Sequence, residues 1–319
     1  MMFTPAAFSQ AKKFLLAHAR PLERARYRFH FENAPAAEVR NALADFQNAD
    51  GGFGRALEPD FRLPASSAIA TAVAFQHFRE AGVSARDPMV LAAVRWTQTA
   101  FDRALDRWPP VPAPVNDWPH APWWTWAEPG KPGFTANPGV EFLAHLWRYR
   151  EVTDAGFLSE LTARADELIT ALPAYPEMHD LICIIRLAET PAVPATLRNR
   201  AARRVRRAGP AIVARDPHAW AQYGVKPLLL APRADSLLTS SLKEAVEANL
   251  DYEVSRQGAD GAWAPNWNWG GLFPEHWPQS ELEWKGVLTL QTLLSLRSFG
   301  RLSPVEHEAV GQTYSLACG

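Results

Sequence analysis

Two stretches far apart in the chain, residues 47–54 (QNADGGFG) and residues 257–263 (QGADGAW), carry the same order of side chains. Each has a glutamine, then Asp-Gly, then a large aromatic residue, and each follows a segment with helical spacing, 36–46 or 242–254. Glycine after aspartate supplies the left-handed backbone conformation that ends a helix. The glutamine amide is expected to bond open backbone groups at a neighbouring helix end, and the aromatic ring to turn inward. The pattern predicts one helix-ending turn used twice.

The rest of the chain also indicates helices separated by loops that proline and glycine mark. Apolar residues recur at three- and four-residue intervals, and no segment shows the alternation of a β-strand. We therefore predict an all-α protein, with no linker that would divide residues 1–319 into domains. The expected helices are 5–20, 24–31, 36–46, 68–80, 88–106, 137–150, 154–172, 177–189, 195–208, 224–231, 236–256, 287–299 and 304–316.

Composition argues against nucleic acid and membrane as partners. The formal net charge is -1, so the chain has no overall field that would attract nucleic acid, and the basic run 198–207 is interpreted as the solvated face of one helix. No stretch approaches the ~20 apolar residues of a membrane span, and the N-terminus lacks the apolar core of a signal peptide. We expect a cytoplasmic protein without a transmembrane segment. The sequence leaves the oligomeric state open.

Metal and disulfide chemistry are not expected either. The chain has two cysteines, Cys183 and Cys318, and neither has a partner at metal-ligand spacing. Cys183 lies in an apolar run and is interpreted as a core residue. We therefore predict a protein that binds no metal and uses no cofactor.

Tryptophan is concentrated in two loops, 108–134 and 263–277. The first is too rich in proline for a regular helix or a central strand, and its aromatic content argues against disorder. Long irregular loops in compact domains are commonly functional. We predict an aromatic-lined site in these loops, for a small apolar or ring-shaped ligand. The residues expected to bind that ligand are Trp118, Trp123, Trp124, Tyr223, Trp267, Trp269 and Trp284.

Gln257, Gly261 and Trp263, with Tyr252 five positions before the glutamine, resemble the QW repeat of squalene-hopene cyclases. Residues 47–53 resemble the variant with phenylalanine in place of tryptophan that protein prenyltransferase β subunits use. The resemblance implies an α6/α6 toroid, two concentric rings of helices around a central cavity. Such a toroid would place the two tryptophan-rich loops at the mouth of the cavity. The chain departs from both families, since the Asp-x-Asp-Asp acid motif of class II terpene cyclases and the zinc-binding Asp-x-Cys pair of the transferases are absent; the nearest pattern, 179–183 (HDLIC), has the wrong interval.

Three carboxylates are the candidate catalytic groups. Glu58 and Asp60 come first, because Glu-Pro-Asp directly follows the first turn, and Glu283 comes next, at the expected start of the last inner helix. The structural alternatives are that Glu58 and Asp60 bond Arg55 or Arg62, or cap the next helix, and that Glu283 is a helix-dipole partner. Sequence alone leaves these alternatives open.

Three functions fit these residues. The favoured one is a terpene-cyclase-like enzyme that protonates an isoprenoid-type ligand with Asp60 or Glu58, because cation-cyclising chemistry needs a buried acid beside aromatic faces. The second is a glycan hydrolase or lyase that uses Glu58 and Asp60 with Glu283, since paired carboxylates and aromatic platforms suit sugars. The third is a binding protein without catalysis. The shortage of cations near the carboxylates makes ionisation of a diphosphate less attractive than protonation.

Overall fold

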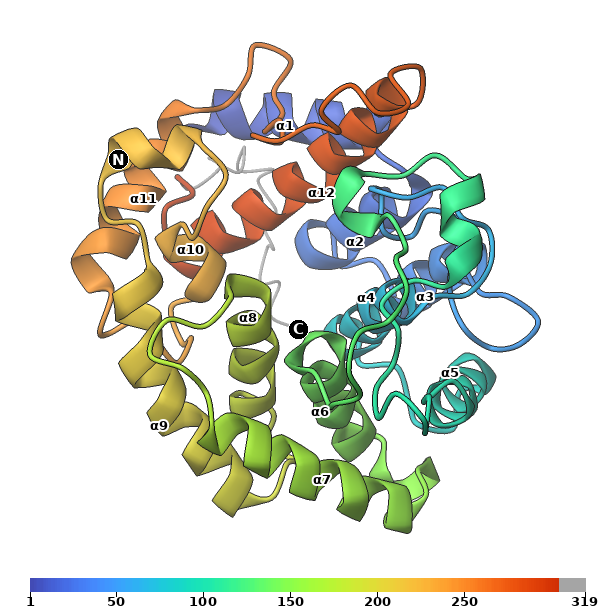
Figure 1. The fold of residues 1–319 in the computed structure, drawn as a ribbon. Helices are drawn as coiled ribbons and strands as arrows, with labels where there is room; N and C mark the ends of the chain where they lie inside the picture. Colours follow the sequence, from blue (N-terminus) through green and yellow to red (C-terminus); the bar gives the residue numbers. More distant parts are fainter. Residues whose placement is uncertain (304–319) are drawn as a thin grey trace, which may run out of the picture.

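The computed structural model describes residues 1–303, and the expected helix 304–316 lies outside them. Within the described residues the protein is all-α, as predicted, with isolated bridges and no β-strand (Figure 1). The helices are α1 (Pro5–His18), α2 (Pro21–Phe31), α3 (Ala36–Ala44), α4 (Ala68–Glu80), α5 (Pro88–Thr99), α6 (Glu141–Arg148), α7 (Ala155–Thr170), α8 (Met178–Ala188), α9 (Ala195–Ile212), α10 (Pro227–Leu230), α11 (Lys243–Ser255) and α12 (Trp277–Ser298).

The helices alternate between two kinds of position. Among the even-numbered helices, α12 packs against α2, α4 against α6, α6 against α8, and α8 against α10. Each odd-numbered helix packs against an even-numbered neighbour, for example α3 against α2 and α4, and α9 against α8. Figure 1 shows the even-numbered helices toward the middle of the molecule and the odd-numbered helices outside them. Because α1 also packs against α12, the first and last described helices meet.

The two Gln-Asp-Gly-aromatic turns have the same hydrogen bonds. Nε2 of Gln47 donates to the carbonyl of the glycine four positions later and to the carbonyl of Met89, both at 3.0 Å. Nε2 of Gln257 likewise donates to the glycine four positions later at 2.9 Å and to Ala7 at 2.8 Å. Met89 and Ala7 lie in the first turns of α5 and α1, where the carbonyls already accept bonds within the helix. The glutamine therefore reaches a neighbouring helix end, as expected, but the helix carbonyl there is already used, and the open carbonyl that it satisfies is that of the turn glycine.

The aromatic residue of each turn points into the core, as predicted. Phe53 is fully buried and Trp263 is 2% exposed. The backbone N–H of Phe53 donates to the hydroxyl of Thr71 in α4 at 3.0 Å, and that of Trp263 donates to the hydroxyl of Thr289 in α12 at 3.1 Å. Each turn therefore joins an odd-numbered helix, held by the glutamine, to an even-numbered helix, held by the aromatic residue.

Glycine 51 gives the first testable prediction. It has φ +92°, and a Cβ there would lie 2.5 Å from the carbonyl oxygen of Ala92 in α5. Gly51→Ala is therefore expected to lower the free energy of unfolding by about 3 kcal/mol, from left-handed strain and backbone overlap together. Gly82→Ala is the matched control, because Gly82 also has positive φ but open space around it, and should lose only about 1 kcal/mol. Equal losses in urea unfolding of the two variants would contradict close packing of the turn on α5.

Some helix boundaries differ from the prediction. Helix α12 begins at Trp277 and not at the expected residue 287. Pro278 lies in its first turn, where a backbone N–H would have no partner within the helix, so the proline does not prevent helix formation. Helix α5 ends at Thr99 rather than near residue 106, since the chain reverses there through a pair of backbone bonds between Asp102 and Arg107. The early start of α12 matters for the site, because it places Glu283 inside the helix and not at its N-terminus.

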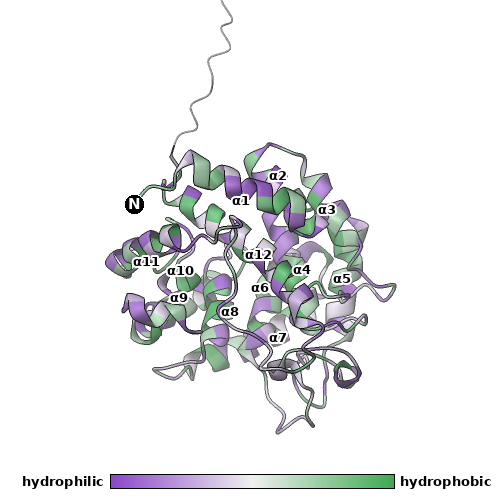
Figure 2. Ribbon diagram, turned by 90° about the horizontal axis from the view of Figure 1, so that it is seen from above, coloured by the Kyte–Doolittle hydropathy of each residue, from purple (hydrophilic) through white to green (hydrophobic). Residues whose placement is uncertain are grey.

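Hydrophilic and hydrophobic residues are mixed along most of the helices (Figure 2). In residues 1–303, no helix combines the length and the apolar character needed to cross a membrane.

Candidate functional site

Glu58 and Asp60 lie in the segment between the first turn and α4. Both are buried, at 8% and 3% exposure. Their segment is paired with the first tryptophan-rich loop, since the carbonyl of Asp60 accepts from the backbone N–H of Ala121 and the N–H of Arg62 donates to the carbonyl of Pro119, both at 2.7 Å. The second tryptophan-rich loop reaches the same segment through side chains. The two loops that the sequence singled out therefore meet at these two acids.

The Asp60 carboxylate is held by neutral donors. Its Oδ1 accepts hydrogen bonds from the indole N–H groups of Trp269 and Trp284, both at 2.8 Å, and from the hydroxyl of Ser280 at 3.3 Å. Within residues 1–303 the other oxygen, Oδ2, has no side-chain or backbone donor. One oxygen is therefore fixed by three donors, and the other has no hydrogen bond of normal geometry with the described residues.

The pKa values of both acids are raised. Burial raises the pKa of the Asp60 carboxyl above its ordinary value of 3.8, and the donors from Trp269, Trp284 and Ser280 act in the opposite direction. Burial, and then the neighbouring Asp60 charge, raises the pKa of Glu58 well above 4.5. Oε2 of Glu58 accepts from the backbone N–H of Asp60 at 2.7 Å, which fixes the loop between them. A raised pKa keeps a carboxylic acid protonated at higher pH, as an acid catalyst requires.

Aromatic rings surround the pair. Trp267 packs edge-on against Trp284 with ring centroids 5.1 Å apart, and Tyr223 packs edge-on against Trp267 at 5.9 Å. The indole N–H of Trp124 partly offsets the rise in the pKa of Glu58, and that of Trp267 does the same for Asp60. Neither indole makes a hydrogen bond of normal geometry with the described residues. The structure thus brings together five of the seven predicted binding residues around the two acids.

Trp118 and Trp123 stay outside this cluster. They are 41% and 49% exposed, on the outer side of the first tryptophan-rich loop. Trp118 contributes a carbonyl that accepts from Nδ1 of His120 at 2.6 Å, and Nε2 of His120 lies 3.1 Å from the hydroxyl of Thr125, so His120 bonds within the loop. The prediction that both tryptophans line the same site as Asp60 is therefore not supported by their positions.

Tyr223 adds a polar group at the edge of the cluster. Its hydroxyl lies 3.1 Å from Nε2 of His179, and Nδ1 of His179 lies 2.8 Å from Oε1 of Glu177, the N-cap of α8. Desolvation, with the charges of Glu177, Asp60 and Glu58, raises the pKa of Tyr223 to about 12. The phenol therefore stays protonated, and its proton is donated to Nε2 of His179 when Nδ1–H of that ring donates to Glu177. The sequence gives no local signal for this contact, because His179 lies 44 positions before Tyr223 in the chain.

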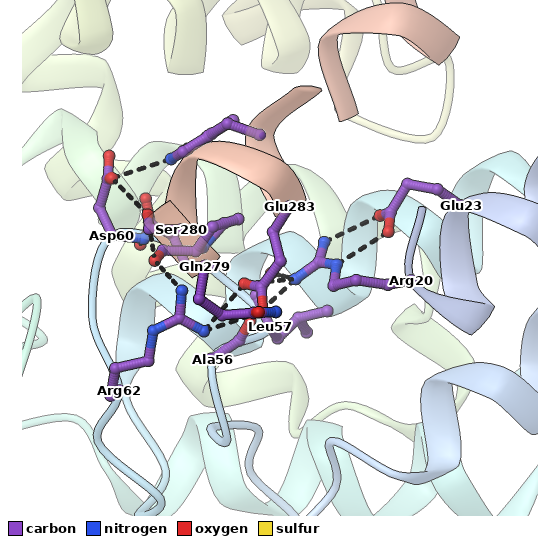
Figure 3. A network of polar contacts seen from close by, with 12 residues as sticks. Arg20, Glu23, Ala56, Leu57, Asp60, Arg62, Gln279, Ser280 and Glu283 are labelled. Carbon is purple, nitrogen blue, oxygen red and sulfur yellow. Dashed lines mark hydrogen bonds and ion pairs between the residues drawn. The ribbon is translucent and has the colours of Figure 1, made fainter. Parts of the chain in front are cut away.

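Glu283 forms an ion pair instead of acting as a helix-dipole partner. Its two oxygens accept from Nη1 of Arg62 at 3.0 and 2.9 Å, and Oε1 accepts from Gln279 at 2.8 Å. Arg20 lies 4.0 Å away and is bonded to Glu23 through two bonds of 2.8 Å (Figure 3). The network joins α12 to the Glu58–Asp60 segment and to the start of α2.

The structural alternatives for Glu58 and Asp60 are wrong. Arg62 pairs with Glu283, and Arg55 donates to the side chain of Asn48 at 3.0 Å. The N-cap of α4 is Ser67, whose hydroxyl accepts from Ala70, so neither acid caps that helix. Both acids are thus free of ion pairs with the two cations that the sequence offered.

The core interpretation of Cys183 is confirmed, since it is 2% exposed. Its thiol lies 3.4 Å from Glu141, which is ion-paired to Arg186 at 2.7 Å, and burial raises the pKa of the thiol well above its ordinary value. A buried thiol beside a carboxylate is inert as a nucleophile. In the part of the chain that the structure describes, no group of three histidine, cysteine or acidic side chains is arranged to hold a metal.

Glu58 gives a second prediction, in the pH dependence of stability. Because its folded-state pKa is raised, protonated Glu58 stabilises the fold fully below its ordinary pKa of 4.5, and this stabilisation is lost as pH rises toward the raised pKa. Between about pH 4 and pH 8, the unfolding free energy of wild type should therefore fall relative to that of Glu58→Gln, whose side chain does not titrate. Urea unfolding across that range measures it, with exposed Glu244→Gln as control. A difference that is constant with pH, or equal to that of the control, would rule out the raised pKa.

Comparison with known protein families and with characterised proteins finds no match for this sequence.

Proposed function

We propose that the chain is an α/α toroid and that it is an enzyme in which Asp60 protonates a neutral, apolar isoprenoid-type substrate. The toroid is supported by the packing of even-numbered helices on one another, by the odd-numbered helices outside them, and by the contact of α1 with α12. The recurrence of one turn, with the same bonds to an outer and an inner helix, supports it further.

The observation that carries the proposed reaction is the surroundings of Asp60. Its carboxyl is buried, its pKa is raised, and its side-chain hydrogen bonds come from uncharged donors on one oxygen only. The proton on Oδ2 adds to a substrate double bond, whose π electrons form the new C–H bond. This leaves a carbocation and the Asp60 carboxylate. The indole donors then stabilise the carboxylate, and the ring faces of Trp267 and Trp284 stabilise the cation.

The polar groups nearby favour an apolar substrate over a phosphate or a sugar. Arg62 is used by Glu283 and by the carbonyl of Pro59, and Arg20 by Glu23 and by loop carbonyls, so neither cation is available to a diphosphate. The glycan reading needs Glu283 as a partner acid, but both oxygens of Glu283 are bonded to Arg62. Asp60 in an aromatic environment suits protonation of an alkene better than recognition of sugar hydroxyls.

The test is a direct assay with neutral polyprenes, for example squalene and geranylgeraniol, and gas chromatography with mass spectrometry of the extract. The expected result is a product of the same mass as the substrate, with different retention and fragmentation, because cyclisation started by protonation and ended by proton loss is an isomerisation. Recovery of unchanged polyprene bound to the protein would favour a binding protein. Stabilisation by oligosaccharides and not by polyprenes would favour the glycan alternative.

A further inference from the structure

The exposed face of α9 carries a group of four arginines, of which only Arg200 has a carboxylate partner among the described residues. Arg200, Arg203, Arg204 and Arg207 follow one another at spacings of three, one and three residues, so they lie on one side of the helix. The opposite face of α9 is apolar and buried, as its residues Leu197 and Val205 show. Helix α9 itself contains no acidic residue. The prediction that the basic run 198–207 forms the solvated face of one helix agrees with the exposure of its arginines. Two surface hollows beside this face are an additional feature.

Two surface hollows lie along this face, between α7 and α9. One, of about 210 Å³, is lined by Arg204, Arg207 and the apolar residues Leu172, Pro173 and Ala208, together with Ala174. The other, of about 290 Å³, is lined by Thr170, Arg200, Arg203 and Arg204. Their linings include neither Glu58 nor Asp60, so the hollows are separate from the acid cluster.

The arginines differ in what they bond. Nη1 of Arg200 donates to Asp166 at 2.8 Å, so its charge is compensated. Nε and Nη2 of Arg204 donate to carbonyls at the end of α7, among them Leu172 at 2.8 Å, which fixes the guanidinium but leaves its charge without a carboxylate. Within residues 1–303, Arg203 and Arg207 have no ion pair and no side-chain hydrogen bond. Three uncompensated guanidinium groups thus border two hollows, and one of the hollows has an apolar wall.

We propose that the groove between α7 and α9 binds a phosphate group attached to an apolar organic group. Arg204 is held in place by α7, and Arg203 and Arg207 are free to turn toward the ligand from either side of it. Guanidinium groups bind phosphate oxygens through paired, charge-assisted hydrogen bonds, and Leu172, Pro173 and Ala208 supply the contact surface for the organic part. The phosphate is either that of a soluble phosphoester or that of a lipid headgroup, and both present the same chemistry to these side chains. The proposal is independent of the reaction at Asp60.

The experiment compares wild-type protein, Arg203→Gln/Arg207→Gln and the control Arg86→Gln/Arg95→Gln, which removes two exposed arginines at α5. Phenyl phosphate is the soluble probe, because it joins a phosphate to an apolar ring, and it is titrated by calorimetry against sodium chloride of equal ionic strength. Vesicles of phosphatidylcholine, with and without phosphatidylglycerol, are tested by sedimentation. Wild type and control should bind one phosphate source equally, and the Arg203/Arg207 variant should bind roughly 100-fold more weakly, about tenfold for each guanidinium.

The two sources are distinguished by the arms of the experiment. Binding of soluble phosphate alone identifies a soluble ligand, and binding of phosphatidylglycerol vesicles alone identifies a lipid headgroup. The proposal is overturned if wild type binds neither source, or if the Arg203/Arg207 variant and the control bind equally well. Arg207→Gln alone provides a second variant if the double variant is poorly folded, and it should bind about tenfold more weakly than wild type.

Discussion

Asp60→Asn is expected to reduce turnover of a neutral polyprene by about 1,000-fold or more while the thermal unfolding temperature stays close to that of wild type. The amide keeps an Oδ1 that accepts from Trp269 and Trp284, so the packing of α12 is retained. Its N–H protons are not acidic enough to protonate a carbon–carbon double bond, and general acids contribute factors of about 10²–10⁴. Product formation per unit time and calorimetric unfolding together measure the two effects.

Asp50→Asn is the matched control for this substitution. Asp50 is also an aspartate that accepts from an indole, since its Oδ2 lies 3.1 Å from Nε1 of Trp96, but it belongs to the first turn and not to the acid cluster. The Asp50→Asn variant should turn over substrate at the wild-type rate. If Asp60→Asn loses folding stability and activity in parallel, or if Asp50→Asn loses as much activity, Asp60 is a structural residue.

Glu283→Ala is expected to lower the free energy of unfolding by about 3–5 kcal/mol. The substitution leaves the guanidinium of Arg62 without its carboxylate in a site where both side chains are largely buried, at 15% and 9% exposure. Removing one partner of a buried ion pair is costly because the remaining charge is uncompensated. Urea unfolding followed by circular dichroism measures the loss.

Glu281→Ala supplies the comparison on the same helix. Glu281 is two residues from Glu283 and makes no ion pair with the described residues, so its removal should change the unfolding free energy by no more than about 0.5 kcal/mol. The double variant Arg62→Ala/Glu283→Ala should lose less than the sum of the two single variants, because neither charge is then left alone. Additive losses would show that the two side chains do not stabilise the fold as a pair.

Much of the fold could be predicted from the sequence because its signals are local. Periodic apolar residues gave α7 and α8 within two residues of their observed bounds, and the Gln-Asp-Gly-aromatic order identified both turns. Helix α9 runs to Ile212, past the expected end at residue 208, with Pro210 inside it. The start of α12 was missed for a physical reason: Trp277-Pro278 resembles a loop in composition, although proline fits the first turn of a helix.

The candidate site was predictable only in part. The Glu-Pro-Asp segment and the tryptophan-rich loops stood out as unusual, and the structure brings them together. Which indoles donate to Asp60 depended on contacts between residues more than 200 positions apart, which no local pattern encodes. The same holds for the pairing of Arg62 with Glu283, which leaves Asp60 with uncharged side-chain donors. A helical repeat of Ser280 and Glu283 with Trp284 would have been the available signal, had the start of α12 been recognised.

The most direct measurement is the incorporation of solvent deuterium into the product. The Asp60 proton exchanges with water between turnovers, so reaction in D₂O delivers a deuteron from Oδ2 to the substrate. Proton donation by Asp60 predicts that wild-type protein forms an isomeric product carrying one solvent deuterium at the carbon where cyclisation begins. A product formed in D₂O without deuterium would contradict it.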